Sequence, residues 1–367
     1  MKIVQLVPAM EQGGVERGVV EMNRAIVAQG WENVVVAKGG RLLDQIERDG
    51  GRVVRLDVKS KNPFTYFARA ARLRKLLEAE KPDVVNAHSR VPAWLFVWAN
   101  RKLKLPWISF AHGPNSVSAY SRVMTYGTVT VVPSRFMADY LKNAYGIAEE
   151  KLRVIPRAID RAKFDPAKLD QDFVERKREE WGTKGRKVVM GLGRITQLKG
   201  YDTLIAATDI VRKSIPEVLT VIVGEAEALR KDVEESLKAQ VKALGLEKHV
   251  VFAGNQQQVA ECLSLADVVV SANTRKPEAF GRSMAEALAM NRPVVATAFG
   301  GALDIVEPGV NGELVPLANA NAEGFAAAIT KALETGYGDV RASAIEKFAF
   351  DKMIKGGLKV YESLVLG

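Results

Sequence analysis

The sequence predicts an α/β fold built from two Rossmann-like domains, each with a parallel sheet. At 367 residues the chain is longer than one typical domain and suits two. Short apolar runs typical of buried strands alternate with stretches typical of helices, which indicates parallel βαβ units. A charged, irregular segment at 156–185, which contains a short helix pattern but no strand run, is expected to connect the domains. The predicted domains are residues 1–160 and 161–345, followed by a helical segment at 346–367.

In the first domain, the predicted strands are the short apolar runs. They are Lys2–Val7, Val34–Ala37, Val53–Val58, Val84–Ala87, Trp107–Phe110 and Val129–Val132. Helices are expected from about Val15 to Gly30 and over Phe67–Leu77, Trp94–Arg101 and Phe136–Tyr145.

The second domain repeats this alternation. Its predicted strands are Lys187–Leu192, Val218–Val223, Val250–Phe252, Asp267–Ala272 and Pro293–Ala298. Its predicted helices are Tyr201–Val211, 227–244, Val259–Leu265, Ser283–Met290 and Phe325–Leu333, with Met353–Leu364 as the last amphipathic stretch.

Composition places the chain among soluble globular proteins, with 47% hydrophobic and 26% charged residues. The one cysteine, Cys262, excludes a disulfide framework within the chain and favours a reducing compartment. No apolar run is long enough for a transmembrane helix, and the first residues form a strand pattern and not a signal peptide. A cytoplasmic location is therefore expected.

The net charge of +10 is carried by one half of the chain. Residues 1–160 contain 25 Lys and Arg against 15 Asp and Glu, which leaves 28 of each sign in the remainder. Such asymmetry suggests an anionic partner for the first half, and a solvated basic face is the alternative. The sequence shows no recognised nucleic-acid motif to go with the charge, so an anionic membrane is the favoured partner.

Two acidic residues, Glu278 and Glu286, stand with seven residues between them in the second domain. Glu278 is expected in a strand-to-helix loop, and Glu286 is expected on the following helix at the same end of the sheet. Ligands of open α/β sheets bind outside the carboxyl ends of the strands, so each carboxylate is a candidate to hold a polyol such as a ribose or a hexose. Taken alone, the spacing also fits an amphipathic helix with surface acids.

Two glycine-containing turns are candidate phosphate sites. Gly13 and Gly14 precede a predicted helix N-terminus, where backbone amides favour an anion, although a tight strand–helix connection is equally compatible. In the second domain, Arg194 and Lys199 flank a glycine-loosened turn that ends at Gly200. A guanidinium and an ammonium together suit a diphosphate, and solvated surface cations are the alternative.

The segment PEAFGRSMAEALAMNRPVVATAFGG, residues 277–301, resembles the E-x7-E segment of retaining GT-B glycosyltransferases of family four. That family has two Rossmann-like domains facing a central cleft. The resemblance implies that Glu278 holds hydroxyls of the donor sugar, that Glu286 holds the ribose, and that Phe280 and Gly281 belong to the donor-binding segment. Asn291 stands where the family usually has Gly.

The same resemblance assigns roles to other residues at strand ends. It implies that Arg194 and Lys199 hold the donor diphosphate, with the glycine loop at Gly13 and Gly14 close to the phosphates. It also places His112 near the donor sugar and Asn255 near the base. The family's glutamate after the double glycine is here the shorter Asp304.

Several N-terminal motifs narrow the resemblance. GGVERG, KNP, HSRVPAW and VIPRAID resemble a bacterial subgroup that builds lipopolysaccharide core and other surface glycans, although Ala158 stands where that subgroup usually has Gly. In this context His88, after a predicted strand, is a candidate acceptor-side group, whereas His249 is expected to be a surface or capping residue. The family also implies that the last helix crosses back to the N-terminal domain.

The implied enzyme moves a sugar from a nucleotide diphosphate sugar to an acceptor hydroxyl with retained configuration and without a metal or other cofactor. Arg194, Lys199 and the amides of Gly13 and Gly14 would neutralise the leaving diphosphate. The acceptor is expected to be lipid-linked or a glycan, and the protein is expected to lie on the inner face of the cytoplasmic membrane. A sugar-nucleotide epimerase and a non-catalytic carbohydrate- or lipid-binding scaffold are the alternatives.

Overall fold

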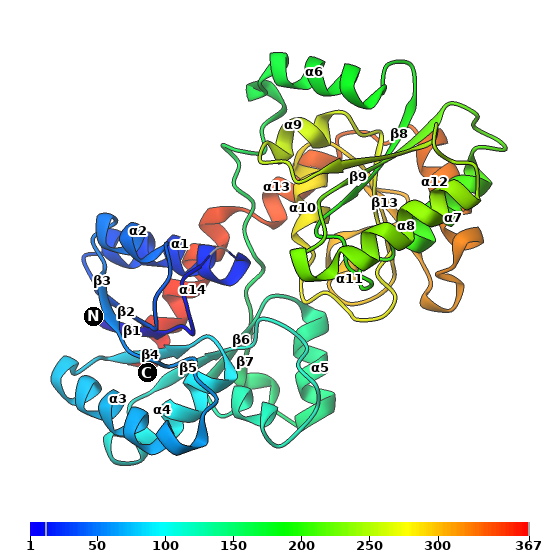
Figure 1. Ribbon diagram of the computed structural model, residues 1–367. Helices are drawn as coiled ribbons and strands as arrows, with labels where there is room; N and C mark the ends of the chain where they lie inside the picture. Colours follow the sequence, from blue (N-terminus) through cyan, green and yellow to red (C-terminus); the bar gives the residue numbers. More distant parts are fainter. Residues whose placement is uncertain (12, 366–367) are drawn as a thin grey trace. The chain divides into compact units, whose positions relative to one another are not determined.

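The computed structural model describes residues 1–11 and 13–365 and divides the chain into two compact units (Figure 1). Unit 1 comprises residues 1–157 together with the chain from 351 onward, and unit 2 comprises residues 158–350. The sequence predicted a boundary after residue 160 and a terminal segment beginning at 346.

Unit 1 contains a seven-stranded sheet in which every adjacent pair is parallel, in the order β3-β2-β1-β4-β5-β6-β7. The direction of winding reverses between β1 and β4, so their carboxyl ends mark the switch point of this sheet. The strands are β1 Lys2–Leu6, β2 Glu32–Ala37, β3 Arg52–Arg55, β4 Val84–Ala87, β5 Trp107–Phe110, β6 Val129–Val132 and β7 Leu152–Val154. The sequence did not predict β7, a three-residue edge strand with only Leu152 buried.

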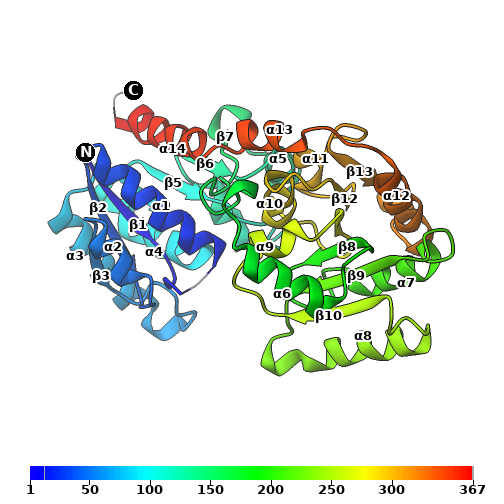
Figure 2. The same cartoon turned by 90° about the horizontal axis from the view of Figure 1, so that it is seen from above.

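Helices cover both faces of the first sheet (Figure 1). One face carries α1 Gly14–Ala28, α2 Leu43–Arg48 and α14 Phe350–Val365, while α3 Tyr66–Glu80 and α4 Arg90–Leu103 pack together on the other. Helix α5, Arg135–Tyr145, follows β6. Figure 2 shows α1 and α14 side by side, and both contribute to one hydrophobic cluster that contains Ile3, Ile26, Ile108, Leu358 and Tyr361.

Unit 2 contains a six-stranded parallel sheet in the order β10-β9-β8-β11-β12-β13. Its switch point lies between β8 and β11. The strands are β8 Lys187–Leu192, β9 Val218–Val223, β10 Val250–Gly254, β11 Val268–Ser271, β12 Val294–Thr297 and β13 Gly312–Val315. The last strand was not predicted, because turn signals dominate the sequence before it.

Alternate residues of the second sheet serve two separate hydrophobic clusters. Val188 and Met190 face one cluster, and Val189 between them faces the other, as the period of a strand requires. The first cluster is covered by α6 Gln171–Trp181, α9 Val259–Ser264, α10 Arg282–Ala289 and α13 Val340–Lys347. The second cluster is covered by α7 Tyr201–Val211, α8 Lys231–Ala243 and α12 Ala322–Glu334.

The segment predicted as an interdomain connection is largely part of unit 2. Helix α6 buries Phe173 and Trp181 in the core of that unit, so most of 156–185 belongs to a folded layer and is not a linker. The prediction failed because lysines, arginines and acids on the exposed side of α6 mask its two buried aromatic residues. Cys262 lies in α9, where burial raises its thiol pKa to about 12. None of the helices formed by the described residues combines the length and apolarity needed to span a bilayer.

Candidate active site

The predicted donor residues of unit 2 gather around the switch point of its sheet. The loop after β8 carries Arg194 and Lys199, and the loop after the neighbouring strand β11 carries Glu278. Because all strands of this sheet are parallel, their carboxyl ends lie at one edge and both loops emerge there. This is the position at which open α/β sheets bind ligands.

An ion pair joins the two loops, with the Lys199 ammonium donating to the Glu278 carboxylate. The side chains remain 27% and 22% exposed, so the pair is accessible. Gly200 allows this approach because it has a positive φ of 67°, and a Cβ there would collide with the carbonyl of Ala272 directly after β11. The close passage of the two backbones places Lys199 beside Glu278.

The double glycine after β12, Gly300 and Gly301, packs against the backbone of the Glu278 loop. Gly301 donates its amide hydrogen to the Glu278 carbonyl at 2.8 Å, and a Cβ on Gly300 would lie 2.6 Å from the same carbonyl oxygen. Gly281 at the start of α10 has a φ of 106°, which ordinary residues rarely adopt. Glycine at positions 300 and 301 therefore lets the backbone after β12 pass directly against the backbone of the Glu278 loop.

The other predicted donor residues lie on the same set of loops. Arg194 forms an ion pair with Glu227, and its side chain is 74% exposed. Glu286 lies on α10, with an oxygen 3.5 Å from the Arg282 guanidinium, and its side chain is 16% exposed. Asn255 directly follows β10 and is exposed.

Unit 1 places polar residues at its own switch point, between β1 and β4. Gly13 caps α1 in an extended conformation, and Gly14 is the first residue of the helix. Arg157, beyond β7, donates to the Gly14 carbonyl at 2.8 Å and to His112 Nδ1 at 2.8 Å. The glycine loop and the end of β5 are thus tied together by one guanidinium.

The two histidines at strand ends contact each other. His112 Nε2 and His88 Nδ1 are 3.0 Å apart, and His88 Nε2 is 3.0 Å from Gln5 Oε1. The rings stack with Phe110, whose centroid is 4.3 Å from that of His112 and 5.8 Å from that of His88. Burial and the Arg157 charge lower the His88 pKa to about 3, and the same causes hold the His112 pKa well below its usual value.

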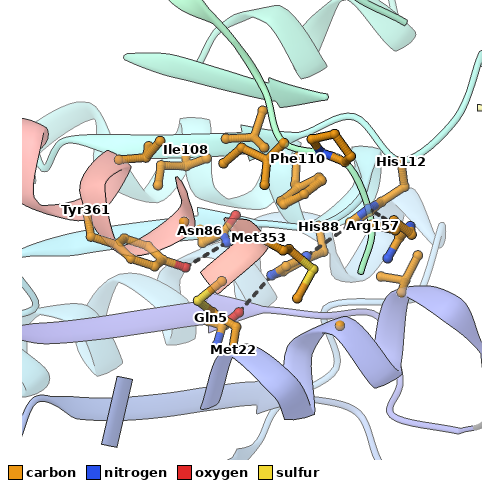
Figure 3. A pocket seen from close by; sticks show the side chains of 17 residues that line it. Gln5, Met22, Asn86, His88, Ile108, Phe110, His112, Arg157, Met353 and Tyr361 are labelled. Carbon is orange, nitrogen blue, oxygen red and sulfur yellow. Dashed lines mark hydrogen bonds between the residues drawn. The ribbon is translucent and has the colours of Figure 1, made fainter. Parts of the chain in front are cut away.

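An apolar cavity of about 50 Å³ adjoins this chain of contacts, beneath α14 (Figure 3). Figure 3 shows Gln5, His88, His112 and Arg157 in one line along its wall. Asn86 lies farther along the wall and donates to the Tyr361 hydroxyl at 3.1 Å. Apolar side chains form the rest of the lining, including Met22, Ile108, Phe110, Val131, Ile155 and Met353.

Comparison with known proteins identifies the chain. The model "Glycosyltransferase Family 4" matches residues 12–163, and the model "Glycosyl transferases group 1" matches residues 173–348. The two matches together cover both units. The chain is a GT-B glycosyltransferase.

Individual relatives agree with this assignment. The lipopolysaccharide core biosynthesis glycosyltransferase LpsE of Rhizobium meliloti is 28% identical, and the match covers 87% of this chain and 85% of LpsE. A glycosyltransferase structure from Rickettsia africae superposes with a TM-score of 0.88 at 25% identity, covering 99% and 98% of the two chains. Anabaena HepE in complex with UDP-glucose has a TM-score of 0.81 at 22% identity, over 99% of this chain and 100% of HepE, which shows the common fold.

Two predicted site residues of this GT-B glycosyltransferase lie in its interior. His88 is 7% exposed with both ring nitrogens engaged, so it does not present a group to an acceptor as predicted. The Phe280 ring is buried against Phe348 with centroids 5.2 Å apart, so only its backbone is left for a donor. The sequence could not show these contacts, because each joins residues that are distant along the chain.

Sequence reasoning missed Arg157 and Gln5. Arg157 lies in the VIPRAID motif, and its place just beyond a strand of the same sheet would have marked it, had β7 been predicted. Gln5 is a polar residue inside an apolar strand, which is an unusual feature that signals a buried hydrogen-bond network. Among the residues that the structure describes, no group of three or more His, Cys, Asp or Glu is placed to hold a metal ion.

Proposed function

We propose that this glycosyltransferase moves a sugar from a nucleotide diphosphate sugar to an acceptor hydroxyl, with retained configuration and without a metal cofactor. The observation that carries the proposal is the Lys199–Glu278 pair at the switch point of unit 2. An accessible cation and anion on adjacent loops match the two chemical parts of such a donor, its diphosphate and its sugar.

The pair suggests how the donor is held. In the free protein Lys199 and Glu278 neutralise each other, which limits the cost of keeping each charge partly buried. A bound donor would exchange this contact for two others, in which diphosphate oxygens accept from Lys199 and sugar hydroxyls donate to Glu278. Arg194 supplies a second cation at the exposed rim, and Glu286 is proposed to accept from the ribose.

The catalytic contribution of these residues is electrostatic. Negative charge grows on the leaving diphosphate as the glycosidic bond breaks, and a fixed cation beside it stabilises the transition state more than the ground state. The proposed retention follows the family resemblance of the E-x7-E segment, in which the leaving group assists a front-face attack.

A thermal-shift panel of UDP-, GDP- and ADP-sugars tests the donor assignment. A sugar nucleotide at 100 times its dissociation constant should stabilise the protein by about 2.7 kcal/mol. The same panel on Lys199→Ala should show a reduced shift. Failure of every nucleotide diphosphate to bind would instead support a non-catalytic scaffold. Conversion of a binding donor without any acceptor would support an epimerase.

The acceptor is proposed to be lipid-linked or a glycan, in the synthesis of lipopolysaccharide or another cell-surface glycan. The relation to LpsE supports this pathway class. The excess positive charge of residues 1–160 supports a location at the inner, anionic face of the cytoplasmic membrane. Nucleic acid is not proposed as a partner.

The membrane-facing part is proposed to be the basic–aromatic segment Lys59–Lys75, which runs from the loop before α3 into that helix. It presents Phe64, which is 96% exposed, and Phe67, which is 64% exposed. The exposed basic residues of this surface are Lys59, Lys61, Arg72 and Lys75. Large exposed aromatic rings beside cations suit the headgroup zone of a bilayer.

Arg69, which also lies in this stretch, has a different role. It is 5% exposed and donates to Thr65 Oγ1, to the Asp57 carbonyl and to the Asn62 carbonyl, at 3.1, 3.4 and 3.1 Å. The residue therefore holds the loop before α3 in place and does not face a membrane. A groove of about 490 Å³ beside it is lined by Lys61, Tyr66, Phe67, Trp94 and Tyr120, among others.

Co-sedimentation with phosphatidylglycerol vesicles tests this surface. Binding should be lost by about 0.5 M salt through screening, and should weaken when Lys59, Lys61, Arg72 and Lys75 are changed to Ala. The matched control changes four exposed lysines of unit 2 to Ala, namely Lys184, Lys213, Lys231 and Lys248. Equal partitioning into neutral and anionic vesicles, or none into either, would contradict membrane docking.

A further inference from the structure

The contacts around His112 form one continuous chain of six hydrogen bonds through unit 1. After Arg157, His112, His88 and Gln5, the chain continues from Gln5 Nε2 to Asn33 Oδ1 at 3.1 Å. Asn33 Nδ2 then donates to Asn23 Oδ1 at 2.6 Å, and Asn23 Nδ2 donates to the Ile46 carbonyl at 3.2 Å. Gln5 and Asn23 are fully buried, and Asn33 and His88 are nearly so.

The two ends of the chain fix its direction. A guanidinium carries only donors, so His112 Nδ1 must accept from Arg157. A backbone carbonyl can only accept, so Asn23 must donate to Ile46. Each residue between the ends has one acceptor and one donor in the chain, so reversal of any one bond would leave two donors or two acceptors facing each other.

We propose that this one-directional chain locks His112 and His88 as neutral imidazoles protonated at Nε2, with His88 and Gln5 as positioning residues for His112 and Arg157. His112 Nε2–H donates to His88 Nδ1, and His88 Nε2–H donates to Gln5 Oε1. Both ring nitrogens of His112 are then engaged, so the residue is neither a general acid nor a general base. The chain instead holds the ring at the end of β5 and holds the Arg157 guanidinium on the Gly14 carbonyl.

The surroundings of the pair favour this neutral state. The other charged or titratable residues among those lining the adjoining cavity are Arg157 and Tyr361. The guanidinium opposes a second positive charge on either ring, and burial raises the Tyr361 pKa to about 12, so that hydroxyl stays neutral. A proton added to His88 would need His112 Nε2 to accept, which is incompatible with neutral His112 accepting at Nδ1 as well.

Nitrogen-15 NMR of the full-length chain tests the tautomers directly. The protein has three histidines, and a His249→Gln variant assigns the signal from unit 2. The expected result is that the other two imidazoles show Nε2–H patterns at pH 7 and remain neutral at pH 5. An Nδ1–H tautomer, or an imidazolium signal at pH 6 from either ring, would overturn the proposal.

Gln5→Glu probes the direction of the hydrogen-bond chain. A carboxylate still accepts from His88 but cannot donate to Asn33, and its charge favours protonated His88. An imidazolium signal from His88 should therefore appear near pH 6 in this variant, together with a changed His112 signal. Signals identical to wild type for both rings would show that Gln5 does not position them.

Two substitutions of His88 test whether the hydrogen-bond chain affects activity. This test rests on the proposed function. In His88→Gln the amide offers the same acceptor and donor, so kcat/KM for the donor that binds in the thermal-shift panel should stay within about threefold of wild type. His88→Phe keeps the stacking but leaves His112 Nε2–H unpaired, and should lower kcat/KM about tenfold or more. Equal loss in both variants would contradict a positioning role.

The NMR measurements separate the two proposals. If no donor is bound or turned over, the proposed function fails while the tautomer result still stands or falls by itself. A pH profile of wild-type kcat/KM that shows a histidine ionisation between about pH 5 and 8 would contradict the fixed neutral histidine pair, if that ionisation is abolished in His88→Gln. If His88→Phe does not fold, the wild-type spectra and His88→Gln remain decisive.

Discussion

The two sheets of this glycosyltransferase use their switch points differently. In unit 1 the β1–β4 edge holds a buried, uncharged chain of imidazoles and amides that ends on one guanidinium. In unit 2 the β8–β11 edge holds an accessible ion pair, Lys199 with Glu278. The same topology therefore supports a rigid neutral network in one unit and exchangeable charges in the other.

Burial accounts for the difference. Gln5 and Asn23 have no exposed surface, and a charge among such groups would be expensive unless it were paired. Lys199 and Glu278 keep about a quarter of their side-chain surface in contact with solvent and pair with each other, which limits the cost of placing two charges there. Topology decides where polar residues collect, and burial decides how costly an unpaired charge would be there.

The largest expected effect comes from removing the charge on the unit 2 pair. Glu278→Gln should lower turnover by on the order of 100-fold or more, because a preorganised electrostatic contact at the reacting sugar is lost. Steady-state kinetics with the best donor gives the measurement. Glu286→Gln is the comparison variant, and it should raise the apparent dissociation constant of the donor more than it lowers turnover. Normal turnover in Glu278→Gln would remove the sugar-side role.

Lowering the pH should reduce the folding stability of unit 1 before that of unit 2. His88 has a pKa of about 3 in the folded protein against about 6.5 when unfolded, so below pH 6.5 the unfolded chain takes up a proton that the fold excludes. Stability is therefore fully present above pH 6.5 and falls toward pH 3, by at most about 1.4 kcal/mol per pH unit for this residue.

Hydrogen-exchange mass spectrometry at pH values between about 7 and 4.5 can compare peptides of the two units on one sample. Exchange rates must first be corrected for their intrinsic pH dependence. In His88→Gln the acid sensitivity of unit 1 should decrease. A parallel loss of protection in both units, unchanged in this variant, would show that the histidine pair does not cause the acid response.

Lys199→Ala should weaken donor binding by about 1.5–3 kcal/mol, the range for a lost hydrogen bond to a charged group. Arg194→Ala should cost less, about 1 kcal/mol, because its side chain is largely exposed to solvent. Calorimetric titration with the binding nucleotide compares them. Lys187→Ala is the control, because it changes an exposed lysine at the opposite end of β8. Equal affinity in Lys199→Ala and Lys187→Ala would exclude Lys199 from the donor site.

An effect on stability with the smallest consequence for the donor site is expected at Asn291, away from the ion pair. This residue has a φ of 58°, and its Oδ1 accepts from the Val340 amide at 3.0 Å. Asn291→Ala should cost about 1–2 kcal/mol of stability through strain and the lost hydrogen bond, and Asn291→Gly less, because glycine adopts this conformation freely. Urea unfolding measures the difference. Donor affinity should stay unchanged in both, in contrast to Lys199→Ala.

The candidate site was predictable from the sequence in outline. The β11 loop and α10 were predicted within one or two residues, so Glu278 and Glu286 were expected at the carboxyl edge of the sheet. Asn291 stands where the family usually has Gly. Asparagine can replace glycine there because it tolerates the left-handed backbone conformation that glycine usually adopts. Asn291 then uses its side chain to hold the start of α13.

The partners of the site residues were not predictable. Lys199 meets Glu278 only because the Gly200 backbone passes against Ala272, a contact between segments that are far apart in the sequence. Helix α6 was misjudged for a related reason, because its charged exposed side outweighs two buried aromatic residues in the sequence.

The sequence by itself determined the alternation of strands and helices, and with it the sheet edges at which glycines, cations and carboxylates collect. Local periodicity is sufficient for this, because parallel strands place all their carboxyl ends at one edge. Only the tertiary structure decided which polar groups meet and in which protonation state. His88 and Gln5 are 83 residues apart, and their hydrogen bond, with the Arg157 charge, sets the tautomer of two rings. Such contacts depend on how distant segments pack, and no local pattern records that packing.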